Sequence, residues 1–136
     1  MYKTLLVPVE PSQIEKHQAS LDMAKALSEP NARIIALTVI EPVPGYFATA
    51  EGMPDLHLEA GQKTLKNLQE FIGDKVHIET KLLNGHAATE ILGFAEGEGV
   101  DCIVMASHQP GFADYFLGST AARVVRHAHC SVHVMR

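Results

Sequence analysis

Residues 3–9 read KTLLVPV, a short and nearly continuous run of apolar side chains. Such a run is typical of a strand that is buried on both faces of a parallel sheet. Residues 32–40 (ARIIALTVI) and 101–106 (DCIVMA) repeat the pattern, and residues 131–135 (SVHVM) predict a last strand. Residues 76–83 (VHIETKLL) alternate at their start, which predicts a strand at or near an edge of the sheet.

Helical segments separate the predicted strands. Pro11 and Ser12 follow the first strand, and Ser12 with Glu15 predicts a capping box that begins a helix. We expect this helix to end at residues 29–31, which read Glu-Pro-Asn. Apolar side chains at helical spacing predict three further helices, at residues 55–72, 88–95 and 118–127.

The order of these elements predicts the fold class. Alternating strands and helices indicate one α/β domain over residues 1–136, with a parallel sheet and helices on both of its faces. We expect an open sheet of five strands in the order 3-2-1-4-5. Residues 41–54 hold three prolines and two glycines and are predicted to form a long irregular loop.

Composition and charge disfavour several kinds of partner and location. Hydrophobic residues make up 46% and charged residues 20% of the 136 positions, as in ordinary folded domains. The net charge of −5, without a basic block, argues against nucleic acid and against an anionic membrane surface. No apolar run has the length of a membrane span and the start lacks a signal-peptide pattern, so we expect a cytoplasmic protein. Cys102 and Cys130 are then expected to be small buried hydrophobic residues.

The predicted topology places a ligand site at the carboxyl ends of the strands. In open α/β sheets, ligands bind in the crevice where the strand order reverses. The loops that meet there carry Val9-Glu10-Pro11, Val39-Ile40-Glu41 and Ala106-Ser107-His108. The last helix begins at Gly118-Ser119-Thr120, whose free N–H groups and hydroxyls suit a phosphate. An ordinary helix cap is the alternative interpretation of the same three residues.

Two familiar nucleotide-binding motifs are absent from the sequence. No GxxxxGK[ST] loop occurs anywhere, and no GxGxxG segment follows the first predicted strand. The sequence therefore predicts neither a P-loop enzyme nor a dinucleotide-binding protein of the GxGxxG type.

Residues 103–136 carry a recognisable pattern. The segment IVMA followed by SHQPGFADYFLGSTAARVVRHAHCSVHVMR resembles the C-terminal signature of the universal stress protein (UspA-like) family. That signature has the form G-x2-G-x9-G-[ST], then a helix, an R-H-[AS]-x-x-x-V stretch and a terminal VxV strand. MYKTLLVPVE at the start and LTVIEP at the second strand also look like this family, so the resemblance covers nearly the whole chain. S-H-x-P before L-G-S is similar to a bacterial subgroup of short, single-domain members.

The resemblance implies a Rossmann-like, adenine nucleotide alpha hydrolase-like fold and an adenine nucleotide ligand. Many members of the family bind ATP or AMP, so ATP, ADP or AMP is expected here, and a single Mg²⁺ can bridge the phosphates. The resemblance implies that the adenine contacts the backbone of Val39, Pro8 and Val9. Glu10 stands where the family usually has an aspartate near the ribose. The phosphate end of the motif matches Gly118, Ser119 and Thr120.

This sequence departs from the family motif before the last helix. The first motif glycine falls on Ala106 and the second on Gln109, and eight residues rather than nine separate Gln109 from Gly118. Alanine adds a methyl group where the backbone should approach the ligand, and glutamine adopts a left-handed turn poorly. Pro110-Gly111 can supply the turn one residue along. Ser107 and His108 complete this predicted side of the site.

Several other polar residues allow two interpretations. His108 can donate to a phosphate or stand exposed in its loop. Arg123 lies one helical turn past Ser119 and can reach a phosphate, although a solvated helix face is the simpler role for it and for Arg126. His127, Cys130 and His133 are metal-ligand types, but Cys130 and His133 have odd spacing on a strand, which disfavours a metal site.

The last strand predicts a homodimer. An edge strand at the end of the chain offers unpaired backbone groups, and a two-fold partner can pair with them. Many members of the family dimerise, so the resemblance also implies this interface, with Val132 and Val134 in it. Packing of one of these valines on a helix is the alternative, and a tetramer stays open.

Three functions remain open at the level of sequence. The first is a regulatory, stress-response module that binds an adenine nucleotide and hydrolyses it slowly at most, since a P-loop lysine and a water-activating base are missing. The second is a slow ATPase or self-phosphorylating enzyme that depends on Ser119 or Glu10, although no nucleophile–base pair is visible. The third is a dimeric interaction module without nucleotide binding, which Ala106 and Gln109 favour.

Overall fold

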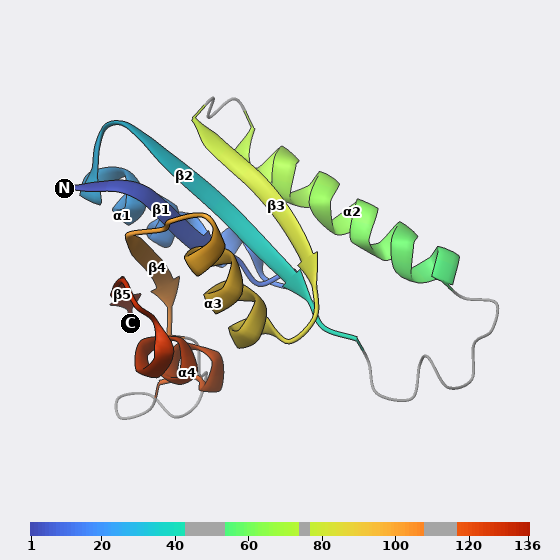
Figure 1. The fold of residues 1–136 in the computed structure, drawn as a ribbon. Coiled ribbons are helices and arrows are strands. Elements are labelled where there is room, and N and C mark those ends of the chain that lie inside the picture. Colours follow the sequence, from blue (N-terminus) through green and yellow to red (C-terminus); the bar gives the residue numbers. More distant parts are fainter. Residues whose placement is uncertain (43–53, 74–76, 108–116) are drawn as a thin grey trace.

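Parallel strands form the centre of the structure, a computed structural model that describes residues 1–42, 54–73, 77–107 and 117–136 (Figure 1). They lie in the order β3-β2-β1-β4-β5, and every neighbouring pair is parallel. The predicted fold class and strand order are therefore confirmed, with β3 at one edge and β5 at the other. The strands are β1 (Tyr2–Pro8), β2 (Ser28–Ile40), β3 (Ile78–Asn84), β4 (Cys102–Ala106) and β5 (Ser131–Met135).

The central strand β1 shows why consecutive apolar residues are needed. Leu5, Leu6 and Val7 are all 0% exposed. Leu5 and Val7 point to one face of the sheet and Leu6 to the other, where they join two separate hydrophobic clusters. Successive side chains of a strand alternate between faces, so only a strand that is covered on both faces requires such a run.

Helices cover both faces of the sheet. On one face lie α1 (Gln18–Leu27) and α2 (Pro54–Ile72), which bury Leu21 and Leu68. On the other lie α3 (Ala87–Gly97) and α4 (Ser119–His127) (Figure 1). This layering leaves the carboxyl ends of β1, β2 and β4 next to the starts of α3 and α4. Across the described ranges, no helix is both long and apolar enough to cross a membrane.

The prediction that Ser12 caps the first helix is wrong. Ser12 lies in a turn, which the N–H of Gln13 closes by donating to the carbonyl of Glu10 at 3.2 Å. The chain then forms a short 3₁₀ segment, η1 (Ile14–His17), whose N-cap is Gln13 and which has no side-chain cap bond. Ser12 therefore belongs to the turn after β1 and Glu15 to η1, so the two residues do not form a capping box.

The expected end of the first helix is also wrong in position. The helix α1 ends at Leu27, and Glu29, Pro30 and Asn31 belong to β2. The β1–β2 register shifts between Tyr2 and Thr4, and Asn31 adopts a positive φ of 66°. Asparagine tolerates this left-handed conformation better than most residues do, so the strand starts with an irregularity.

The two cysteines differ in burial. Cys102 is 1% exposed, as expected, and burial raises the pKa of its thiol to about 11, so the thiol stays protonated at neutral pH. Cys130 was expected to be buried and is only half-buried, although it packs on the core and burial also raises the pKa of its thiol. Cys102 packs on the α1 face of the sheet and Cys130 on the α3 face. Each therefore acts as a packing residue in a different cluster.

The turn between β3 and α3 depends on Gly85. Gly85 has a φ of 146°, and an added Cβ would lie 2.6 Å from Oε1 of Glu90. We expect Gly85→Ala to lower the free energy of unfolding by about 1–3 kcal/mol, because it strains the backbone and displaces Glu90. Gly93→Ala is the matched control: an added Cβ there meets nothing within 4 Å, and we expect stabilisation of up to about 1 kcal/mol. Urea unfolding of both variants measures this, and equal effects would contradict the account.

Candidate functional site

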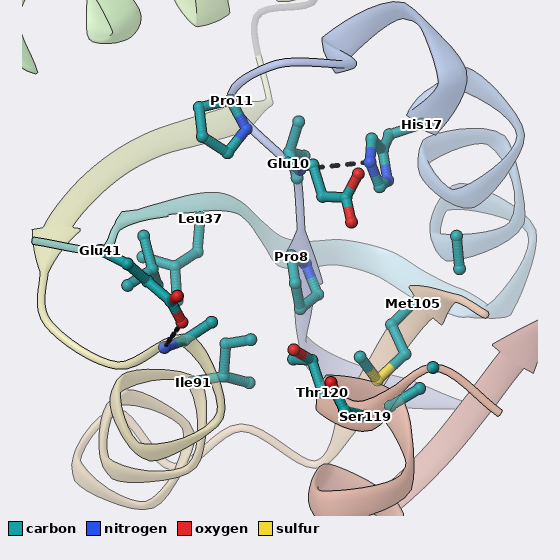
Figure 2. Close-up of a pocket in the computed structure, with 16 residues that line it drawn as sticks. Pro8, Glu10, Pro11, His17, Leu37, Glu41, Ile91, Met105, Ser119 and Thr120 are labelled. Atoms are coloured by element: carbon teal, nitrogen blue, oxygen red, sulfur yellow. Dashed lines mark hydrogen bonds between the residues drawn. The ribbon is translucent and has the colours of Figure 1, made fainter. Parts of the chain in front are cut away.

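A cavity of about 450 Å³ opens at the carboxyl ends of β1, β2 and β4 (Figure 2). It lies where the strand order reverses, because the chain leaves β1 toward β2 on one side and returns to β4 on the other. The turn η1 and the starts of α3 and α4 complete its walls. Its volume is that of a small-molecule site, for which about 300–1,000 Å³ is usual.

The floor of the cavity is apolar. Val9 is 3% and Val39 8% exposed, and Leu37 and Met105 line the same floor. The N–H of Val9 donates to the carbonyl of Leu37 at 2.8 Å, which fixes the end of β1 against β2. This floor offers a flat aromatic ring apolar contact and fixed backbone groups at its edge.

The start of α4 lies across the cavity from this floor. Gly118 is the N-cap residue, and the N–H of Ala122 donates to its carbonyl at 2.8 Å. The N–H groups of Ser119, Thr120 and Ala121 therefore precede the first bond within the helix, and all three residues line the cavity. Together with the helix dipole, such groups favour an anion. Figure 2 shows Ser119 and Thr120 at this rim, with Thr120 pointing toward Pro8.

The start of α3 is different, because a carboxylate of the chain already occupies it. Oε1 of Glu41 accepts a hydrogen bond from the N–H of Ala87 at 2.8 Å. At the start of α4 the N-cap residue is Gly118, and no side chain caps the helix there. Of the two helix starts that line this cavity in the described residues, α4 is thus the one left open to an external anion.

The acidic residues lie on the other rim. Glu10 follows β1 and Glu41 follows β2, and both line the cavity. Carboxylates repel phosphates and accept hydrogen bonds from hydroxyl groups. The cavity is therefore polarised, with acceptors near β1 and β2 and anion-binding N–H groups at α4.

The cavity unites most of the site residues that the sequence predicts. It is lined by Pro8, Val9, Glu10, Val39, Ala106, Gly118, Ser119 and Thr120. Ser107 does not line it, and its N–H instead donates to the carbonyl of Met135 at 2.8 Å, which extends the β4–β5 ladder. His108 and Gln109 lie outside the described residues.

The arginines of α4 do not line the cavity. Nη1 of Arg123 lies 3.3 Å from Nδ1 of His86 at the start of α3, and Arg126 is exposed. For Arg123, the geometry favours a contact between helices over a phosphate ligand.

Sequence reasoning missed several lining residues. Leu37 lies two positions before Val39 and therefore on the same face of β2, so strand alternation could have identified it. Met105 directly precedes Ala106, so strand alternation places it on the opposite face of β4 and could not have identified it from Ala106. His17 and Ile91 carried no signal in the sequence, because their place depends on how η1 and α3 pack at the crevice.

Metal ligands do not converge in the described part of the chain. No group of three or more His, Cys, Asp or Glu side chains lies close enough there to hold a metal ion.

A second hollow lies at the opposite end of the sheet. Its volume is about 920 Å³, and the starts of β2 and β3 line it. Arg33, one of the cations that line it, is already engaged, with Nη2 lying 3.1 Å from Oε1 of Glu79 and Nη1 lying 3.0 Å from Oε2 of Glu98. These carboxylates raise the pKa of Arg33 above its usual range, the bond to Glu79 contributing most. Although it is larger, this hollow lacks the open anion-binding helix start that we find in the first cavity.

A family model described as the universal stress protein family matches residues 1–136. The chain belongs to the universal stress protein family. Universal stress protein MJ0531 of Methanocaldococcus jannaschii is 33% identical over 144 aligned residues, which cover 100% of this chain and 83% of that protein. Universal stress protein G of Escherichia coli O157:H7 is 30% identical, and the alignment covers all of both chains.

Solved structures share the universal stress protein fold. Hypothetical protein MJ0577 aligns with a TM-score of 0.72 and 27% identity, over 99% of this chain and 96% of that one. UspA of Lactobacillus plantarum aligns with a TM-score of 0.69 and 23% identity, over 99% and 98%. A universal stress protein in complex with cAMP aligns with a TM-score of 0.63 and 19% identity, over 99% and 97%. The last two likenesses show the fold alone.

Glu41 offers a stability test of the helix-start geometry. We expect Glu41→Ala to lower the free energy of unfolding by about 0.5–2 kcal/mol, because the N–H of Ala87 loses a charged acceptor. Glu59→Ala changes an exposed carboxylate of α2 and should stay within about 0.5 kcal/mol of the parent. Thermal or urea unfolding measures both, and an unchanged Glu41→Ala variant would show that the contact contributes no stability.

Proposed function

We propose that this universal stress protein binds an adenine nucleotide, ATP, ADP or AMP, in the cavity at the carboxyl ends of β1, β2 and β4. One observation carries the proposal: the open start of α4 faces an apolar floor across a single cavity of about 450 Å³. An aromatic base joined to a phosphate needs these two surfaces at once. We further propose that the protein is a regulatory module of the stress response whose partner contacts change with nucleotide occupancy.

The polarity of the cavity gives the proposed orientation of the ligand. The adenine ring lies on the floor of Val39, Leu37 and Met105, next to the backbone at the end of β1. The ribose hydroxyls face the carboxylate of Glu10. The phosphates then reach the N–H groups and hydroxyls of Ser119 and Thr120. An Mg²⁺ ion that bridges the phosphates would need few protein ligands.

A neighbour of known structure supports the choice of base. The universal stress protein solved with cAMP demonstrates that this fold can hold an adenine nucleotide. That protein is only 19% identical to this chain, so the likeness supports the proposal through the fold alone.

The geometry at Ala106 weakens the alternative of a module that has lost nucleotide binding. Ala106 lines the cavity, and a volume of about 450 Å³ remains despite its methyl group. One methyl group therefore narrows the site without filling it.

An enzymatic role has less support. Turnover needs a group that activates water or a hydroxyl, within hydrogen-bond reach of it. Among the described residues, no hydrogen bond links the hydroxyl of Ser119 or Thr120 to a base. We therefore expect hydrolysis to be slow or absent.

The central test is titration calorimetry of nucleotide-stripped protein with ATP, ADP and AMP, with and without Mg²⁺. We expect binding, and we expect Gly118→Val to weaken it by about ten- to a hundredfold, because a branched side chain enters the cavity. The backbone of Gly118 has φ −56° and ψ 155°, which any residue adopts, so the variant acts through volume and not through strain.

Gly97→Val is the control for this test. Gly97 ends α3 at the far end from the cavity, and an added Cβ there meets nothing within 4 Å. Equal affinity of parent and Gly118→Val would place the ligand elsewhere, and no binding to any of the three nucleotides would refute the proposed function.

The enzymatic alternative has its own readout. We expect no more than slow release of phosphate from ATP, and no mass increase of one phosphoryl group after incubation with ATP and Mg²⁺. Rapid turnover, or a phosphoryl group that disappears in Ser119→Ala, would favour the enzyme instead.

We also propose that two copies pair through β5. In the described part of the chain this strand is at the edge of the sheet, so one row of its backbone groups faces no neighbouring strand there. Val132 and Val134 pack on the α3 face of the core and remain half-buried, so they contribute to the core as well as to the proposed contact. Sedimentation equilibrium should give twice the mass of the chain, and a single-chain mass at all concentrations would contradict pairing.

A further inference from the structure

A buried histidine lies in the wall of the cavity. His17 ends η1, is 5% exposed and lines the cavity beside Glu10. Its Nε2 accepts a hydrogen bond from the backbone N–H of Glu10 at 3.1 Å, drawn as a dashed line in Figure 2. Neither the family motif nor the predicted site contains this residue.

The direction of this bond determines the protonation of the ring. A backbone N–H can only donate, so Nε2 must offer its lone pair. His17 is therefore neutral, with its proton on Nδ1. If Nε2 gained a proton, two N–H groups would face each other and the bond would be lost.

The bonded amide belongs to the residue that faces the proposed ribose. Glu10 has an exposed side chain, so its carboxylate depends on the backbone for its position. That backbone is held before Glu10 by the bond from Val9 to Leu37 and after it by the bond from Gln13 to the carbonyl of Glu10. The bond to His17 holds the amide of Glu10 itself.

We propose that His17 is a positioning residue of the nucleotide site. In its neutral form it holds Glu10 toward the ribose, and when protonated it releases the Glu10 amide and lowers nucleotide affinity. Acidification would then release nucleotide from the protein. The effect on affinity rests on the proposed function, whereas the state of the ring and its bond to Glu10 do not.

The charges around His17 act in both directions. Burial and the acceptor role favour the neutral ring, whereas nearby carboxylates favour the charged ring. Among the described residues, the carboxylates that line the cavity with it are Glu10 and Glu41. On the elements packed against η1, the other charged groups whose side chains the structure describes are exposed, namely Glu15 and Lys16 on η1, Asp22 and Lys25 on α1, and Glu59, Lys63, Lys66 and Glu70 on α2.

Nucleotide affinity should fall as the pH is lowered. The neutral ring supports binding, so affinity is highest at alkaline pH and falls as the ring takes up a proton. Histidine normally changes charge between about pH 5 and about pH 8, which sets the range to be measured. Losing the bond should weaken binding by about three- to tenfold.

The test compares AMP affinity by calorimetry from about pH 8 to about pH 5.5 in the parent, His17→Gln and His129→Gln. Glutamine at position 17 keeps an acceptor that does not titrate. The phosphate of AMP titrates identically in all three proteins, so differences between their pH profiles report on the protein. We expect the parent and His129→Gln, which loses an exposed histidine outside the cavity, to weaken on acidification three- to tenfold more than His17→Gln does.

The outcomes separate the two proposals. Identical pH profiles of the parent and His17→Gln would overturn the positioning role while leaving nucleotide binding intact. If no protein binds AMP at any pH, the proposed function fails. Nitrogen-15 NMR of the ligand-free protein then tests the protonation of His17 and its bond to the Glu10 amide. We expect an unprotonated Nε2 at pH 8 and a Glu10 amide resonance that follows the titration of the ring. An Nε2 that is protonated at pH 8, or a Glu10 amide resonance that does not change as the ring titrates, would overturn the proposal by itself.

Discussion

The burial of β1 on both faces is the constraint on which the rest of the structure depends. Leu5, Leu6 and Val7 have no exposed surface, so β1 must lie between two strands and two layers of helices. Its start is fixed by Asp101, whose carboxylate accepts the N–H groups of Lys3 and Thr4 at 2.9 and 3.0 Å. With β2 on one side and β4 on the other, the connections diverge at its far end and a crevice opens there.

The crevice acquires its chemistry from the two helix starts that it brings together. The carboxylate of Glu41 accepts the N–H of Ala87 at the start of α3, whereas no side chain caps the start of α4 at Gly118. The turn after β1 and η1 place Glu10 and His17 on the opposite rim, where the buried imidazole of His17 accepts a hydrogen bond from the amide of Glu10. The site is therefore polarised before any ligand arrives, and preorganised groups of this kind lower the cost of binding.

Much of this architecture could be predicted from the sequence, because it depends on patterns along single strands and helices. The apolar runs identified β1, β2 and β4, and the topology rule then brought Glu10, Val39 and Ser119 to one cavity. The helix start predicted at Ser12 was wrong, because a turn and a 3₁₀ segment can use the same residues as a capping box. His17 could not be found, since its role depends on a bond between side chain and backbone that only the folded turn creates.

The proposed function requires that a single ligand spans the floor of the cavity and the start of α4. Chemical shift mapping of the backbone amides on addition of AMP tests this most directly. The account predicts that the largest changes lie at Val9, Val39, Ser119 and Thr120, on both sides of the cavity at once. Changes at the starts of β2 and β3 instead, around Asn31 and Arg33, or at one side of the cavity alone, would contradict it.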